Sequence, residues 1–207
     1  MKTRPLVLMA VFSALCLCGI SRGTPIEFTA VLSGAAESPP NDSAGTGTAD
    51  VWYDSTTHWL QVSVVFSGLT GTSTASHIHA ATALPDTGTA GVATETPSFP
   101  GFPLGVTSGS YTDSFDLTLL SSFNASFVTA NGGTAAGAEA ALVAAMWAGE
   151  SYLNIHSTYR PGGEIRGFLH KVPDSSATAA MVIFALIAMV GFYRNQRIPA
   201  FAEVDET

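Results

Sequence analysis

Cysteine and positive charge are both scarce in this chain. Its 207 residues include 2 cysteines, Cys16 and Cys18, and 8 lysines or arginines against 16 aspartates or glutamates. The formal net charge is therefore −8 at pH 7, and charged residues of both signs make up 12% of the chain. Nucleic acids and anionic lipids are bound by basic surfaces, so this balance argues against both as partners. The length and the hydrophobic share of 46% suit one domain with a real core.

The amino-terminal segment 1–23 predicts a secretory signal peptide. A basic start is followed by an apolar run that is short for a membrane span, and small residues precede Thr24. An uncleaved anchor is the alternative. Cleavage before Thr24 would remove both cysteines, so we expect a mature protein without disulfides.

Short alternating segments follow, separated by turns rich in Pro, Gly, Asn and Asp. The clearest is 58–67, where every second residue is apolar. This spacing predicts an antiparallel sandwich or barrel rather than βαβ units. Segment 135–148 differs: its alanine-rich composition predicts one short helix, ended by Gly149. We expect one core containing Leu60, Val62, Val64, Phe66, Leu153 and Ile155.

Segment 151–169 predicts a β-hairpin around which the chain is organised. Arg160-Pro-Gly-Gly163 has turn chemistry, and the two arms bring His156, Glu164 and Arg166 together. His77 and His79 lie on one face of a predicted strand, because alternate residues of a strand share a face. We expect these two histidines to meet His156 in one polar site.

The three histidines, His77, His79 and His156, have two interpretations. Three imidazoles form a site suited to copper or zinc. Alternatively, the rings bind the irregular segment 80–109 by hydrogen bonds and hold it shut; loops of this length are usually functional or mobile.

The neighbouring charged residues also leave alternatives open. Glu164 and Arg166 either support the site, with Glu164 orienting a ligand histidine, or form a structural ion pair across the hairpin. Glu37, in the loop before Pro39-Pro40, either joins this polar cluster or faces solvent. His58 and His170 match no motif, and we expect both to be exposed.

The carboxyl-terminal part predicts a membrane span. Residues 177–193 are apolar and uncharged, about the minimum length for a span, and Arg194 and Arg197 follow at once. This order places 24–171 outside the membrane and the tail 198–207 in the cytoplasm, as a single-pass protein of the cell envelope before any processing. A buried core helix is the alternative for 177–193.

Four segments, LSGAAESPP, FSGLTG, ASHIHAA and YLNIHSTYRPGGEIRGFL, resemble in order the blocks of the CHRD domain, named after chordin. The resemblance runs from Phe28 to His170, with Ser157 standing where the family usually has threonine. It implies an immunoglobulin-like or superoxide-dismutase-like β-sandwich, found as a module of secreted proteins without a settled catalytic activity. The His-x-His pair is reminiscent of the copper ligands of copper-zinc superoxide dismutase.

The tail 172–197 resembles a VPDSG-type relative of the PEP-CTERM sorting signals, with Ser176 where glycine is usual and the extra segment 198–207 after the arginines. This resemblance implies processing by an exosortase-type enzyme. The residues that would take part are Pro173, Asp174, Ser175, Arg194 and Arg197.

Two functional hypotheses follow. The first is a non-enzymatic CHRD module, secreted or anchored at the cell envelope, that acts in adhesion or in contact with extracellular matrix or polysaccharide. The second is a metal-binding or redox protein that uses copper or zinc at His77, His79 and His156. A dismutase would need further histidine ligands, and only His58 and His170 remain for that role. We therefore favour the binding module. Its expected parts are the signal peptide 1–23, the CHRD domain 24–171, the sorting signal with its transmembrane helix 172–197, and the cytoplasmic tail 198–207.

Overall fold

The computed structural model describes residues 24–173. The predicted signal peptide, the span 177–193 and the processing residues Asp174, Ser175, Arg194 and Arg197 lie outside the described residues. Within 24–173, no helix is both long and apolar enough to cross a membrane. The topology and sorting predictions therefore remain predictions.

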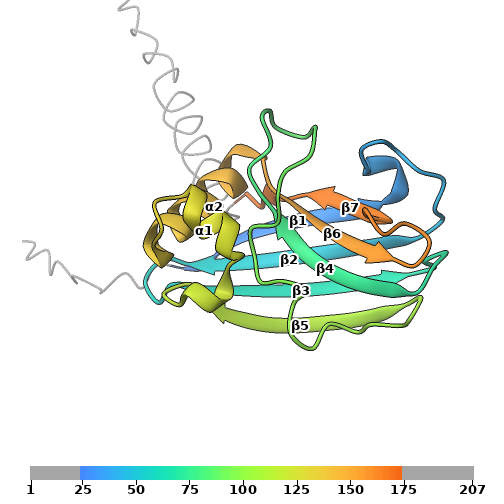
Figure 1. Ribbon diagram of the computed structural model, residues 1–207, viewed down its shortest axis with the longest axis horizontal. Coiled ribbons are helices and arrows are strands. Elements are labelled where there is room, and N and C mark those ends of the chain that lie inside the picture. Colours follow the sequence, from blue (N-terminus) through green and yellow to red (C-terminus); the bar gives the residue numbers. More distant parts are fainter. Residues whose placement is uncertain (1–23, 174–207) are drawn as a thin grey trace, which may run out of the picture.

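The described strands form one antiparallel sheet, which curls into a half-barrel (Figure 1). The order is β4-β6-β7-β1-β2-β3-β5, and β8 also pairs with β1. The strands are β1 (Ile26–Ser33), β2 (Thr46–Asp54), β3 (Trp59–Ser67), β4 (Ser73–His79), β5 (Gly109–Asp116), β6 (Tyr152–Ser157), β7 (Ile165–Phe168) and β8 (His170–Lys171).

The expectation of antiparallel β structure is confirmed, but the expected two-sheet sandwich is replaced by this single curled sheet. The reason lies in β1. It pairs with β2 along its whole length and with β7 and β8 on its other edge, so it joins strands that a sandwich would divide between two sheets. A curled sheet can enclose its core on its concave side, and helices and loops cover what remains open.

Two α-helices lie at one end of the sheet, where one was expected (Figure 1). α2 (Ala135–Ala148) is the predicted helix, and it ends at Gly149, whose φ of 70° gives the left-handed C-cap. α1 (Ala125–Ala130) was not predicted; Asn124 caps it by accepting from Ser126 N. Short 3₁₀ helices occur at η1 (Gly34–Ala36) and η2 (Leu120–Ser122).

The core contains every apolar residue that strand alternation assigned to it. The six predicted side chains, Leu60, Val62, Val64, Phe66, Leu153 and Ile155, are each at most 2% exposed. The long segment between β4 and β5 also enters the core: Phe102 stacks on Phe66 at 5.5 Å, and Phe99 stacks on Tyr111 at 5.7 Å. The segment is therefore anchored by aromatic packing, which positions the carbonyl groups described below.

Val62→Ala should lower the free energy of unfolding by about 1–3 kcal/mol, because it removes buried methyl groups and leaves a cavity. Urea unfolding of the domain would measure this. Val65→Ala is the matched control: Val65 lies on the same strand but faces outward and is 56% exposed, so it should change stability little. Equal effects of the two substitutions would contradict the inward phase assigned to Val62.

Candidate functional site

The three histidines of the predicted site lie together on the outer face of the sheet. Ile78 points into the core, so His77 and His79 on either side of it point outward from β4. β6 pairs with β4 and presents His156 outward, since Ile155 is in the core. The ring centroids are 5.1 Å apart for His77 and His156, 5.7 Å for His77 and His79, and 5.8 Å for His79 and His156.

Each ring uses one nitrogen to bind a backbone carbonyl. His77 Nε2 lies 2.5 Å from the Pro97 oxygen, His79 Nδ1 lies 3.0 Å from the Ala90 oxygen, and His156 Nδ1 lies 2.8 Å from the Pro161 oxygen. A carbonyl oxygen only accepts hydrogen bonds, so each of these nitrogens carries the proton.

The other nitrogen of each ring has no hydrogen-bond partner among the described residues. These atoms are His77 Nδ1, His79 Nε2 and His156 Nε2. Each ring offers one nitrogen that lies within 4.8 Å of a nitrogen of each of the other two. The arrangement thus combines the two interpretations from the sequence: one nitrogen of each ring holds a loop, and the other remains available for a ligand.

Burial keeps the three rings neutral. It lowers the pKa of His77 and of His156, and it lowers the pKa of His79 to about 4, against the opposing effect of the carbonyl hydrogen bonds. His79 also stacks on Tyr152, with ring centroids 4.8 Å apart. At neutral pH, each of the three adjacent rings therefore has one unprotonated nitrogen.

Arg166 is paired with Glu37, and not with Glu164. Its Nε lies 3.8 Å from Glu37 Oε2 and donates to the Ala36 oxygen at 2.6 Å. The guanidinium also donates to the Gly88 oxygen at 2.9 Å and lies over the ring of Tyr152 at 4.6 Å. Glu37 is buried: desolvation raises its pKa to about 7, although Arg166 acts in the opposite direction. Glu37 thus belongs to the polar cluster instead of facing solvent.

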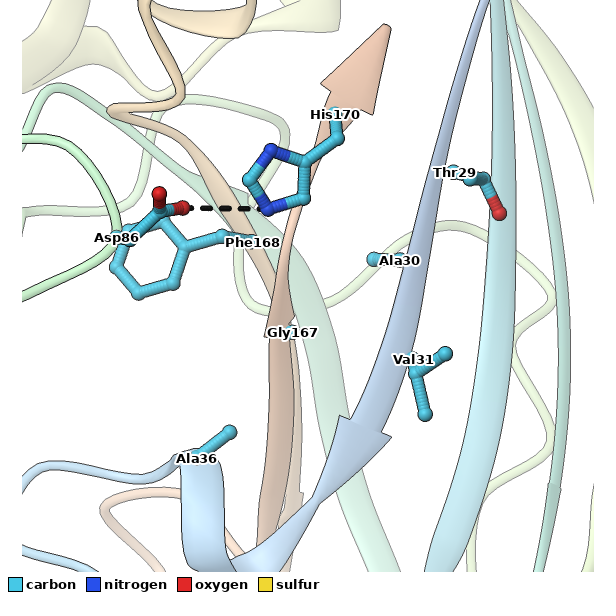
Figure 2. Close-up of a pocket in the computed structure, with 8 residues that line it drawn as sticks. All are labelled: Thr29, Ala30, Val31, Ala36, Asp86, Gly167, Phe168 and His170. Atoms are coloured by element: carbon cyan, nitrogen blue, oxygen red, sulfur yellow. Dashed lines mark ion pairs between the residues drawn. The ribbon is translucent and has the colours of Figure 1, made fainter. Parts of the chain in front are cut away.

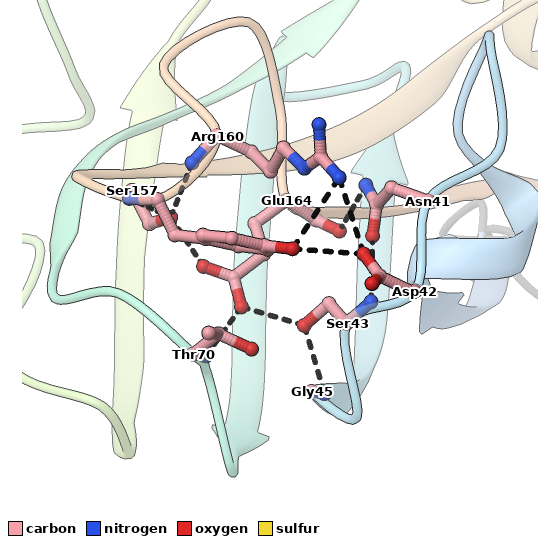
Figure 3. Close-up of polar contacts among 9 residues, drawn as sticks. Asn41, Asp42, Ser43, Gly45, Thr70, Ser157, Arg160 and Glu164 are labelled. Atoms are coloured by element: carbon pink, nitrogen blue, oxygen red, sulfur yellow. Dashed lines mark hydrogen bonds and ion pairs between the residues drawn. The ribbon is translucent and has the colours of Figure 1, made fainter.

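Glu164 has a different role from either that the sequence suggested. Its carboxylate accepts from Ser43 Oγ at 2.6 Å, from Thr70 N at 2.5 Å and from Ser157 Oγ (Figure 3). It also accepts from Gly71 N at 3.2 Å. Burial alone would raise the pKa of Glu164, but these hydrogen bonds together lower it. The side chain ties the β1–β2 loop, the β3–β4 loop and the β6–β7 hairpin together.

The remaining histidines lie away from this cluster. His58 Nδ1 is 2.8 Å from Glu139 Oε1, which also accepts from Tyr53 Oη at 2.7 Å. His170 Nε2 is 3.2 Å from Asp86 Oδ1, beside a groove of about 410 Å³ lined by Val31 and Phe168 (Figure 2). Both rings are about half exposed and contact an acid.

Sequence reasoning missed Tyr152 and Asn154 as members of the cluster. Both are buried on the outer face of β6, which they share with His156. Alternation along the strand could have placed them there, since they precede His156 at intervals of two residues. Ser43 and Thr70, which bind Glu164, carried no comparable signal.

Fold and site together define a mainly β domain with a three-histidine cluster, buried at His77 and His79 and partly exposed at His156, on the outer face of its sheet. The CHRD domain family matches residues 28–169, and the chain belongs to this family. No curated protein and no solved structure matches it.

Glu164→Gln should destabilise the domain by roughly 2–3 kcal/mol, because an amide cannot accept all the hydrogen bonds that converge on the carboxylate and leaves donors unpaired. Urea unfolding measures the change. The control Glu27→Gln, on the half-buried outer face of β1, should stay within about 0.5 kcal/mol of the wild type. A Glu164→Gln protein as stable as this control would show that the loops do not depend on the carboxylate.

The low pKa of His79 predicts acid sensitivity in the metal-free domain. The unfolded state takes up a proton at His79 near the ordinary value of 6.5, whereas the folded state does so only near 4. Above pH 6.5, neutral His79 therefore makes its full contribution to the free energy of unfolding. This contribution is lost as the pH falls toward 4, with a slope of up to about 1.4 kcal/mol per pH unit. Unfolding with a chelator present should show the stability of the wild type falling relative to His79→Gln over this range. If the stability difference between the wild type and His79→Gln does not change with pH, the lowered pKa of His79 is contradicted.

Proposed function

We propose that the domain binds one copper or zinc ion through His77, His79 and His156. The observation that carries this proposal is the proton arrangement in three adjacent rings: each ring donates one N–H to a backbone carbonyl, and its other nitrogen has no partner among the described residues. Histidines that bind metals almost always donate their second nitrogen in this way, because the carbonyl sets the tautomer and ring orientation.

Electrostatics favour a cation over water between the rings. One nitrogen of each ring lies within 4.8 Å of one nitrogen of each of the other two, and the three nitrogens that bind no carbonyl have no donor among the described residues. A water molecule has two hydrogens, so it would satisfy two of the three nitrogens and leave one buried acceptor unpaired. A metal ion would accept all three lone pairs.

The spacing requires a modest closure of the site. Metal–nitrogen bonds of about 2.0–2.1 Å in tetrahedral geometry place ligand nitrogens roughly 3.3–3.5 Å apart. Imidazole suits both zinc and copper, and three ligands leave one position for water or another donor.

We infer a binding role for this site rather than a dismutase reaction. A dismutase-type centre needs further histidine ligands, and within 24–173 the other two histidines contact Glu139 and Asp86 instead. The sequence patterns at 1–23 and 177–193 support an exported module, processed by an exosortase-type enzyme and held at the inner membrane before processing. The exported module would then be in contact with extracellular matrix or polysaccharide.

Titration of the metal-free protein with Cu²⁺ and with Zn²⁺ tests the metal proposal. We expect one ion per chain in the wild type. Substituting His77, His79 or His156 by glutamine should lower the affinity by roughly 10–100-fold or more, since each change removes a ligand.

His58→Gln and His170→Gln are the matched controls, because both histidines are half exposed and lie on acids away from the cluster. Both should bind the ion as tightly as the wild type. Binding that survives the three cluster substitutions, or that is lost with the controls, would assign the metal to another site.

A further inference from the structure

Large apolar side chains are exposed at the end of the sheet where α1 and α2 lie, which we call the helical end (Figure 1). Trp59 begins β3 and pairs with Asp116, and Leu119 N donates to the Asp116 oxygen at 3.1 Å. Trp147, in the last turn of α2, contacts the ring of Phe28 edge-on. The four exposed side chains are Trp59, Leu119, Leu120 and Trp147, each between 44% and 56% exposed.

The surface around these side chains carries little charge. Segment 117–138, which contains η2 and α1, has no charged residue. Asp54 and Asp116 turn back on their own turns: Asp54 Oδ1 accepts from Thr56 N at 2.7 Å, and Asp116 Oδ1 accepts from Thr118 Oγ1 at 2.6 Å. The helical end therefore combines tryptophan, leucine and hydroxyl side chains. This composition suits the interface between a bilayer and water, where tryptophan is enriched.

The described chain leaves the domain at the same end. Val172 N donates to the Glu27 oxygen at 2.8 Å, and the row of paired residues continues from Glu27 through Trp52 to Gln61. Trp59 is two residues nearer the end of the sheet than Gln61, so it projects past the level of Val172. Lys171 Nζ lies 5.0 Å from the ring of Trp147, which places this ring beside the departing chain as well.

The tether to the predicted membrane span is short. Residues 174–176 separate Pro173, the last described residue, from the apolar run 177–193. An extended chain covers about 3.3–3.6 Å per residue, so the path from Pro173 to Ala177 reaches about 14 Å at most. A domain on such a tether brings one surface close to the bilayer, and this is the surface from which the chain leaves.

We propose that the helical end lies against the bilayer that carries the span 177–193, with Trp59, Leu119, Leu120 and Trp147 in the headgroup region. The net charge of −8 opposes contact with anionic lipid, so the surface fits zwitterionic headgroups. This contact goes beyond metal binding. It rests on the membrane tether given with the proposed function, and it is independent of the metal.

Tryptophan fluorescence tests the proposal on the full chain. The three tryptophans, Trp52, Trp59 and Trp147, all belong to the described domain, so the signal reports contacts of the domain and not of the span. The chain is placed in phosphatidylcholine vesicles at fewer than one chain per vesicle, with a chelator present because bound copper would also quench. We expect weaker fluorescence in vesicles whose lipid is brominated near the headgroup end of its acyl chains than in plain vesicles. Equal fluorescence in both, whether the side chains then face water or a second copy of the chain, would overturn the proposal.

Variants assign the quenching to the helical end. Leu119→Ser combined with Leu120→Ser should lose most of it, and Trp59→Ser should lose part of it; all three side chains are exposed, so the fold should be retained. Leu104→Ser is the matched control: Leu104 is 52% exposed at the opposite end, where Gly105 N donates to the Ser73 oxygen at the start of β4. Quenching that survives both helical-end changes, or that falls equally in the control, would overturn the assignment.

Vesicle flotation separates the docking from the tether. A chain that floats with the vesicles while its tryptophans stay unquenched would support the span and overturn the docking. A chain that does not float would show that the predicted span is wrong, and the docking fails with it. His77→Gln, which removes a ligand of the proposed metal site, should be quenched like the wild type. Loss of quenching in His77→Gln would show that the contact does not lie at the helical end.

Discussion

The buried carboxylate of Glu164 is the interaction on which the polar end of this domain depends. It accepts from a serine of the β1–β2 loop, from two backbone amides of the β3–β4 loop and from Ser157 in its own hairpin. A buried carboxylate without such donors would be strongly disfavoured, so the three segments must close around it together. The hairpin turn fixed in this way carries the Pro161 carbonyl that orients His156.

The other two rings of the cluster are oriented by a different part of the fold. Ala90 and Pro97 belong to the segment between β4 and β5, which is anchored in the core by Phe99 and Phe102. Aromatic packing on the concave side of the sheet thereby determines where carbonyl oxygens stand on its convex side. Since those oxygens select which nitrogen is protonated, core packing decides which lone pairs are left for a ligand.

The sequence was informative about the residues of the site and much less so about their partners. His77 and His79 could be placed on one strand face, and His156 on a neighbouring hairpin, because strand alternation is a local property. Glu164 and Arg166 lie close in sequence and suggested a pair, yet each binds groups from distant loops. Sequence spacing carries no information on which loop closes over a given charge, and desolvation then decides the pairing.

The sequence by itself determined the antiparallel β character, the core face of β3 and β6, and α2 with its Gly149 cap, because periodicity and capping act over a few residues. Only the tertiary structure decided that β1 joins its neighbours into one curled sheet instead of two facing ones. It also decided that Glu37, and not Glu164, lies beside Arg166. Likewise, it left His77, His79 and His156 each with one nitrogen that has no partner within residues 24–173. These features depend on contacts between segments far apart in the chain, whose geometry is set when the whole core packs and the polar groups lose their water.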